Sequence, residues 1–256
     1  MSCYQVTINE DSNQTNDAKS YIGGVPTLPN DISIPCCKLC SAEMTFFLQI
    51  AFPTQHKWNG YTLALFCCTS CVDEKYFIPE MLTGRISKAI IPEGFLDEYQ
   101  RNFSVIVFDT SEGIIKDCYV PKVKYKHLDL LSSIEPKEIK FKVGGTPRWY
   151  LGDETPSRYG DSSEMNFLMQ IPGDFEFEIL PDAPKQVKLG LGKKVTTLNR
   201  PFYRLFLANN IYFLELARIC QKYISLLKYK ITVWGQLLED LKVDLQHFNV
   251  EGILLW

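Results

Sequence analysis

The chain has 256 residues, and its 46% hydrophobic and 22% charged content is that of an ordinary soluble globular protein. This composition excludes a mostly disordered or collagen-like chain. With 27 basic and 30 acidic residues, the net charge of −3 argues against a protein that coats nucleic acid. Nine cysteines are too few for a disulfide-stapled miniprotein, and an odd number cannot all pair within one chain.

The N-terminal segment 1–20 is predicted to be a polar arm, because residues 9–20 (NEDSNQTNDAKS) are almost entirely polar. The first residues lack the basic region and apolar core of a signal peptide. No window of 18 residues is apolar and uncharged, so no membrane span and no membrane partner is expected. These features favour a cytoplasmic location.

The body of the chain is predicted to be rich in antiparallel strands. Four runs of aromatic and aliphatic residues have strand composition: Thr45–Phe52, Tyr61–Cys68, Phe103–Phe108 and Tyr203–Phe213. Residues 173–179 (GDFEFEI) alternate, so their apolar side chains should face a core and their glutamates water.

A different period begins at Glu215. Apolar residues from Leu216 to Phe248 recur at steps of three and four, which predicts one amphipathic helix, or two with a break at Gly235. The apolar stripe could dock on the body of the protein or receive a partner helix.

An internal repeat gives the domain organisation. Residues 22–50 and 143–171 align without a gap at an offset of 121, and ten of the 29 positions are identical. We therefore expect a first repeat over 21–142, a second over 143–214 and a helical tail over 215–256. The expected fold is a β-rich α+β fold with two intertwined, duplicated halves.

Both copies contain Gly-Gly-x-Pro, which predicts a turn, and a strand of pattern Met-x-Phe-x-x-Gln-Ile. An amide carried on a strand can bind the protein's own backbone or that of a ligand. On the second interpretation, a groove between the repeats would bind another protein through aromatic and amide side chains: Phe46, Gln49, Trp149, Phe167 and Gln170.

The cysteines form the most specific chemical motif in the chain. Cys37 and Cys40 form one Cys-x-x-Cys, and Cys68 and Cys71 form a second. Two such knuckles joined by a strand pair are how a four-thiolate zinc site is assembled, so we expect one structural Zn²⁺ per chain. Cys36 or Cys67 could replace a neighbouring ligand. Free buried thiols and a redox dithiol are the alternatives.

The surroundings of the motif favour a structural metal. No histidine neighbours either knuckle, which argues against an open catalytic zinc. At the offset of 121, Cys37 corresponds to Arg158 and Cys40 to Asp161, so the second copy lacks these ligands.

No catalytic motif is found. The three histidines, His56, His127 and His247, are far apart in sequence. An enzyme using carboxylates such as Asp153, Glu154 or Glu164 in a cleft between the repeats remains an alternative.

The order Gly-Gly-x-Pro, Cys-x-x-Cys, Met-x-Phe-x-x-Gln-Ile and Cys-x-x-Cys resembles the YwqG-like (DUF1963) family, and is similar to its eukaryotic relatives, the programmed-cell-death-2 proteins. Gly144–Trp149, Met165–Ile171 and Tyr203–Phe213 resemble the second half of that family. The resemblance covers roughly residues 20–214 and implies two related β-rich halves, often with a zinc knuckle. The second-half cysteines and a matching C-terminal tail are absent.

The resemblance implies a protein-binding role, either as a toxin-immunity protein or as a chaperone for a ribosomal or other basic protein. We therefore expect a non-enzymatic protein whose partner is another polypeptide, a toxin or a client chain, and not a nucleic acid.

Overall fold

The computed structural model describes residues 2–10, 13–72, 88, 90–91, 101–134, 141–148, 155–159, 163–189, 195–205, 211–216 and 253–255. These residues form strands and one short 3₁₀ helix, η2 (Thr110–Glu112). The prediction of a β-rich fold is confirmed. Most of the predicted helical tail, from 217 to 252, lies outside the described residues; Glu215 and Leu216 belong to a strand, as do Ile253–Leu255.

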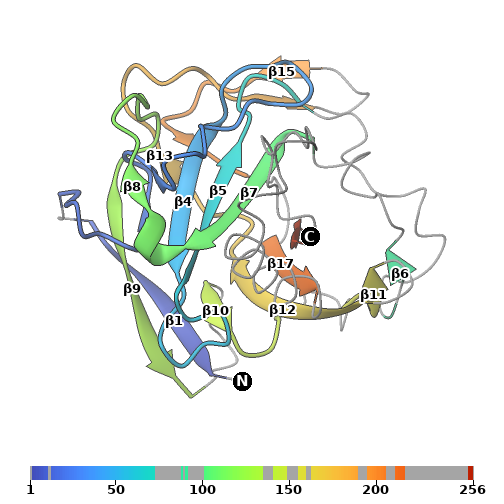
Figure 1. Ribbon diagram of the computed structural model, residues 1–256. Coiled ribbons are helices and arrows are strands. Elements are labelled where there is room, and N and C mark those ends of the chain that lie inside the picture. The colour runs from blue at the N-terminus through green and yellow to red at the C-terminus, as the bar shows by residue number, and fades with distance from the viewer. Residues whose placement is uncertain are drawn as a thin grey trace, which may run out of the picture.

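One curled sheet of twelve strands dominates the structure (Figure 1). Its main path runs β18-β17-β12-β10-β1-β9-β2-β4-β5-β7. These strands are β1 (Cys3–Asn9), β2 (Tyr21–Ile22), β4 (Thr45–Ala51), β5 (Tyr61–Cys67), β7 (Phe103–Asp109), β9 (Lys126–Ser133), β10 (Lys142–Gly144), β12 (Ser163–Ile171), β17 (Ile211–Leu216) and β18 (Ile253–Leu255).

Neighbouring strands along this path are antiparallel. Outside it, β11 (Arg158–Tyr159) pairs with β12 and, in parallel, with β6 (Ile90–Ile91). Three two-stranded sheets flank the large one: β13 (Phe177–Glu178) with β16 (Phe202–Tyr203), β14 (Val187–Leu189) with β15 (Val195–Thr197), and β3 (Thr27–Leu28) with β8 (Ile114–Ile115).

The sequence repeat is a structural repeat with the same register. In the first half β2 pairs with β4 so that Tyr21 faces Gln49, and in the second half β10 pairs with β12 so that Lys142 faces Gln170. Both members of the pair are shifted by the same 121 residues. The register of β4 with β5 shifts between Phe46 and Leu48, and that of β12 with β17 shifts between Phe167 and Met169, so the β-bulge is also repeated.

The two halves exchange their first strands. β1 precedes the first half in sequence but pairs with β10, while β9 precedes the second half and pairs with β2. β1 and β9 then pair with each other over their full shared length, from Cys3 opposite Ser133 to Asn9 opposite His127. The sheet is therefore continuous through both halves, and residues 3–9, expected to belong to a polar arm, form its strand β1.

An insertion in the second half packs against the first. The segment between β12 and β17 carries β13 to β16. Phe177 and Tyr203 from this insertion contact the bulge residue Phe47, with ring centroids 5.0 and 6.0 Å apart. All three side chains belong to one hydrophobic cluster that combines residues from both halves. A second cluster, on the first half alone, includes Tyr21, Phe46 and Phe66 and lies against the cysteine turns.

Candidate metal centre

The first cysteine turn lies in the loop before β4 and is held by its own backbone. The N–H of Cys37 donates to the carbonyl of Ala42 at 2.8 Å, and the N–H of Ser41 donates to the carbonyl of Cys37 at 2.9 Å. Ser41 has a φ of 60°, in the left-handed region, which lets the chain reverse directly after Cys40. Cys37 and Cys40 are thereby presented from one tight turn.

The second cysteine turn directly follows β5. The N–H of Cys68 donates to the carbonyl of Asn102 at 2.8 Å, which fixes this turn beside the start of β7. Because β4 and β5 pair antiparallel with Thr45 opposite Cys67, the loop before β4 and the turn after β5 lie at the same end of the sheet. The strand pairing brings the two turns together.

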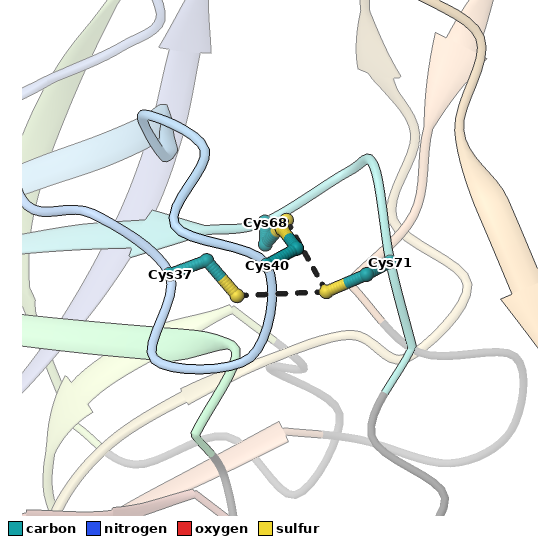
Figure 2. Close-up of side chains that lie close together, drawn as sticks. All are labelled: Cys37, Cys40, Cys68 and Cys71. Carbon is teal, nitrogen blue, oxygen red and sulfur yellow. Dashed lines mark hydrogen bonds between the residues drawn. The ribbon is translucent and has the colours of Figure 1, made fainter.

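Four sulfurs meet where these turns converge (Figure 2). The Sγ atoms of Cys37, Cys40, Cys68 and Cys71 all lie within 4.8 Å of one another. The Sγ of Cys71 is 3.5 Å from that of Cys37 and 3.5 Å from that of Cys68, and the Sγ atoms of Cys40 and Cys68 are 3.6 Å apart. Tetrahedral Zn–S bonds of about 2.3 Å place sulfurs roughly 3.8 Å apart, so the arrangement is compatible with a metal site.

Backbone amides support negative charge on these sulfurs. The N–H of Leu39 donates to the Sγ of Cys37 at 3.4 Å. The amides of Ala42 and Ser70 are bonded in the same way to Cys40 and Cys68, two residues before each of them. Each amide stabilises a thiolate, the form that binds a metal.

Burial and neighbouring groups shift the pKa values of three of the clustered thiols. Burial opposes ionisation of Cys40, but the Ala42 amide and the neighbouring thiols outweigh it and lower its pKa. Burial raises the pKa of Cys68 to about 11 against the opposing Ser70 amide, and burial and the adjacent sulfurs raise the pKa of Cys71 further. A cation bound among the sulfurs would favour ionisation of Cys68 and Cys71.

The two neighbouring cysteines do not belong to the four-sulfur group. Cys36 is exposed and forms an isolated bridge with Glu43. Cys67 is buried in the strand, where burial raises its thiol pKa well above its usual range, and its Sγ donates to the carbonyl of Cys68. The sequence leaves open whether Cys36 or Cys67 replaces a neighbouring ligand. In the structure, Cys37 and Cys68 belong to the cluster.

The second half has a different arrangement at the corresponding position. Arg158, the counterpart of Cys37, lies in β11, which pairs with β12 on one side and with β6 on the other. The N–H of Lys88, next to β6, donates to the carbonyl of Thr155 at 2.8 Å. The second half therefore has strand β11 at the position of the first cysteine turn. This strand is paired with β6, which belongs to the first half. Asp161, the counterpart of Cys40, lies outside the described residues.

The cysteine turn also contacts the second-half insertion. Thr69, between Cys68 and Cys71, is buried, and its carbonyl accepts a hydrogen bond from the N–H of Val187 in β14 at 2.9 Å. Its hydroxyl lies 3.2 Å from that of Thr45. The sequence motif marks only the cysteines, so this role of Thr69 was not predicted. A metal held by the cysteines would fix Thr69 and, through it, the insertion.

Four residues of the predicted partner-binding set are buried. The exposed fractions of Phe46, Gln49, Phe167 and Gln170 are 0, 1, 7 and 0%. The prediction that they line an open groove needs correction, because their side chains face the interior. Trp149, the fifth member, lies outside the described residues.

The two glutamines bind the protein's own backbone, which is the other role that a strand-borne amide could have. The Gln49 Oε1 accepts from the N–H of Thr27 at 3.2 Å, and the Gln170 Oε1 accepts from the N–H of Arg148 at 2.9 Å. Thr27 and Arg148 also differ by 121 residues, and each directly follows a Gly-Gly-x-Pro turn. The repeated glutamine therefore secures the repeated turn.

The two described histidines, His56 and His127, lie in different surroundings. His56 is buried and stacks on Phe52, and burial together with the charge of Lys57 lowers its pKa to about 4. His127 lies 3.4 Å from Asp129 on β9. The structure does not describe His247, Asp153, Glu154 or the side chain of Glu164.

The chain matches no protein-family model, and a search of curated proteins finds no match for it. Among the described residues, no helix has the length and apolar character needed to cross a membrane.

Proposed function

We propose that the chain is a non-enzymatic protein that binds another polypeptide and is stabilised by one structural zinc ion. The specific role that we propose is that of a toxin-immunity protein. The alternative role is that of a chaperone for a ribosomal or other basic client. The observation that carries the zinc part is the set of four cysteine sulfurs within 4.8 Å of one another.

Zinc is the metal that this donor set favours. Four thiolates in a tetrahedral arrangement are typical of structural zinc, whereas oxygen ligands suit magnesium and calcium. Three of the sulfurs receive an amide two residues further along the chain, from Leu39, Ala42 and Ser70. These donors lower the cost of holding four thiolates around one divalent ion.

A structural role fits the position of the site. With four sulfur ligands, zinc has no open coordination position for a water or a substrate. Cys37 and Cys68 are 2 and 3% exposed and belong to the hydrophobic cluster of the first half. A metal bound here would close that cluster and hold the end of the β4–β5 pair.

The polypeptide-binding part rests on the family resemblance of the repeat and the cysteine turns. Both roles implied by that resemblance, immunity protein and client chaperone, are binding roles. The buried repeat residues do not supply the binding surface, so a partner would contact other parts of the molecule.

The experiment is purification of the tagged full chain from native extract under reducing conditions, followed by mass spectrometry. We expect one partner polypeptide in stoichiometric amount and about one zinc per chain. Zinc without any stoichiometric partner would leave the metal site standing and reject the binding role.

A further inference from the structure

The hairpin of β14 and β15 has one strand edge that no described residue covers. The N–H of Leu198 donates to the carbonyl of Gln186 at 2.8 Å, and the register places Val187 opposite Thr197. In an antiparallel pair the bonded and non-bonded positions alternate, so the backbone groups of Val187 and Thr197 point away from each other. The Val187 N–H is bonded to Thr69, whereas the described residues provide no partner for the Thr197 N–H.

The side chains of β15 leave this edge accessible. Val195 is 54% exposed, and Thr197 is also exposed. Between them, the hydroxyl of Thr196 is buried, and no described residue is its hydrogen-bond partner. A short strand with open backbone groups and an unsatisfied hydroxyl is suited to pairing with a further strand.

The hairpin lies in the most basic stretch of the chain. Residues 183–205 contain six basic residues and no acidic residue, although the chain as a whole has a net charge of −3. Of the described basic residues, Lys185 and Arg200 are exposed and Lys188 is partly exposed, while Arg204 forms an ion pair with Glu176. The Arg200 guanidinium stacks over Phe202, 5.6 Å from the ring centroid, which holds it near the end of β15.

The base of the hairpin is fixed, so its edge is presented in one orientation. Gln186 and Arg204 exchange two bonds: the Gln186 Nε2 donates to the Arg204 carbonyl at 2.7 Å, and the Arg204 N–H donates to the Gln186 Oε1 at 3.0 Å. The Tyr203 hydroxyl donates to the carbonyl of Pro184. Together with the Thr69 bond, these contacts reduce the ordering that a partner would have to impose.

We propose that the outer edge of β15 is a docking site for an extended, acidic segment of a partner polypeptide, which adds as a third strand. Backbone hydrogen bonds would supply the pairing, and Lys185, Lys188 and Arg200 would favour acidic side chains. A nucleic acid lacks the repeating N–H and C=O groups that this edge matches. The inference rests on the proposed function, since it names the kind of polypeptide that the chain would bind.

The test uses the full-length protein and fluorescence anisotropy with a labelled ten-residue peptide of alternating Glu and Val. The matched probes are a Lys and Val peptide of the same length and a single-stranded RNA of equal charge. We expect the acidic peptide to bind at least about tenfold more tightly than either control, and its affinity to fall as salt rises. Equal affinity for the two peptides, or tighter binding of the RNA, would overturn the inference.

Two variants separate strand pairing from charge attraction. Thr197→Pro removes one outward N–H, and we expect it to weaken the acidic peptide about tenfold. Lys188→Glu combined with Arg200→Glu reverses charge without altering the backbone, and we expect a similar loss. The control for charge is Lys19→Glu with Lys88→Glu, two exposed lysines outside the hairpin, which changes the net charge equally. If this control pair weakens binding as much as the hairpin pair, the site assignment is wrong.

The native purification distinguishes failure of the docking site from failure of the proposed function. If the wild type recovers a stoichiometric partner and the Lys188→Glu, Arg200→Glu variant recovers equally much, the docking site is rejected while the binding role stands. If the wild type recovers no partner, the binding role itself is rejected.

Discussion

The carbonyl of Thr69, between two of the four clustered cysteines, accepts a hydrogen bond from the N–H of Val187, 118 residues further along the chain. This bond joins the cysteine turn of the first half to the insertion of the second. The second half lacks the cysteines at its own corresponding position, yet part of it is held by the site of the first. One metal could therefore stabilise segments of both halves.

This link predicts that metal removal loosens the β14–β15 hairpin. Without a bound ion the turn of Cys68 to Cys71 loses its cross-link, and Thr69 is no longer held as an acceptor. Hydrogen exchange followed by mass spectrometry should show faster exchange of the Val187 amide after chelation, while exchange in β1 and β9 changes little. Unchanged protection of the Val187 amide would show that the link to the metal is absent.

We expect the loss of stability on replacing a glycine by alanine to depend strongly on which glycine is replaced. Gly23 has a φ of +57°, and a Cβ on it would lie 2.4 Å from the carbonyl oxygens of Val123 and Lys124. Gly60 has a φ of +88°, with no atom within 4 Å of its would-be Cβ. Gly23→Ala should lower the free energy of unfolding by more than about 2 kcal/mol, and Gly60→Ala by about 1 kcal/mol, measured by urea denaturation. Equal losses would mean that the contact around Gly23 is wrongly placed.

The repeated glutamines predict unequal losses of stability. Gln49 makes two bonds, to the N–H of Thr27 and to the carbonyl of Lys19. Gln170 bonds the N–H of Arg148, and among the described residues its Nε2 has no partner. Gln49→Ala should therefore cost more than Gln170→Ala, each within roughly 1–3 kcal/mol for an orphaned buried donor. Thermal unfolding of the two variants, with exposed Gln5→Ala as the control, measures the difference. A larger loss for Gln170→Ala would contradict the prediction.

His56 predicts a pH dependence with a defined sign. In the unfolded chain it takes up a proton as the pH falls below about 6.5, but in the folded chain its pKa is about 4. Between these values the unfolded state binds more protons, so the free energy of unfolding falls as the pH is lowered from 6.5 towards 4, by up to about 1 kcal/mol per pH unit.

The control for this dependence is His56→Gln, in which that part of the slope should disappear. The relevant measurement is the difference in slope between wild type and variant across pH 4 to 6.5, obtained by denaturant unfolding. Parallel slopes would show that burial of His56 does not govern stability in this window.

Much of the strand structure could be predicted from the sequence. The strands predicted at Thr45–Phe52 and Tyr61–Cys68 match β4 and β5 to within one residue at each end, because dense aromatic and aliphatic runs mark buried strands. The alternation of 173–179 places Phe177 in the core, although only Phe177 and Glu178 form a strand. The repeat offset of 121 predicted two related halves, and the strand register of the structure follows the same offset.

The exchange of β1 and β9 could not be predicted. These strands occupy equivalent places in the sheet, but their sequences (CYQVTIN and KHLDLLSS) share no pattern that would align them. Their pairing is long-range, and it depends on both halves being folded. The same holds for Thr69, whose partner Val187 belongs to an insertion that the first half lacks. Burial of Gln49 and Gln170 was one of two interpretations that a strand amide leaves open.

The clustering of Cys37, Cys40, Cys68 and Cys71 was predicted, because the two Cys-x-x-Cys turns lie at the same end of a strand pair. The zinc that they would bind stays a prediction. Its most direct test is the metal content of full-length protein purified under reducing conditions, measured by inductively coupled plasma mass spectrometry. We expect about one zinc per chain in the wild type and in Cys118→Ser, and little zinc in Cys40→Ser. No zinc in the wild type, or an equal amount in Cys40→Ser, would contradict it.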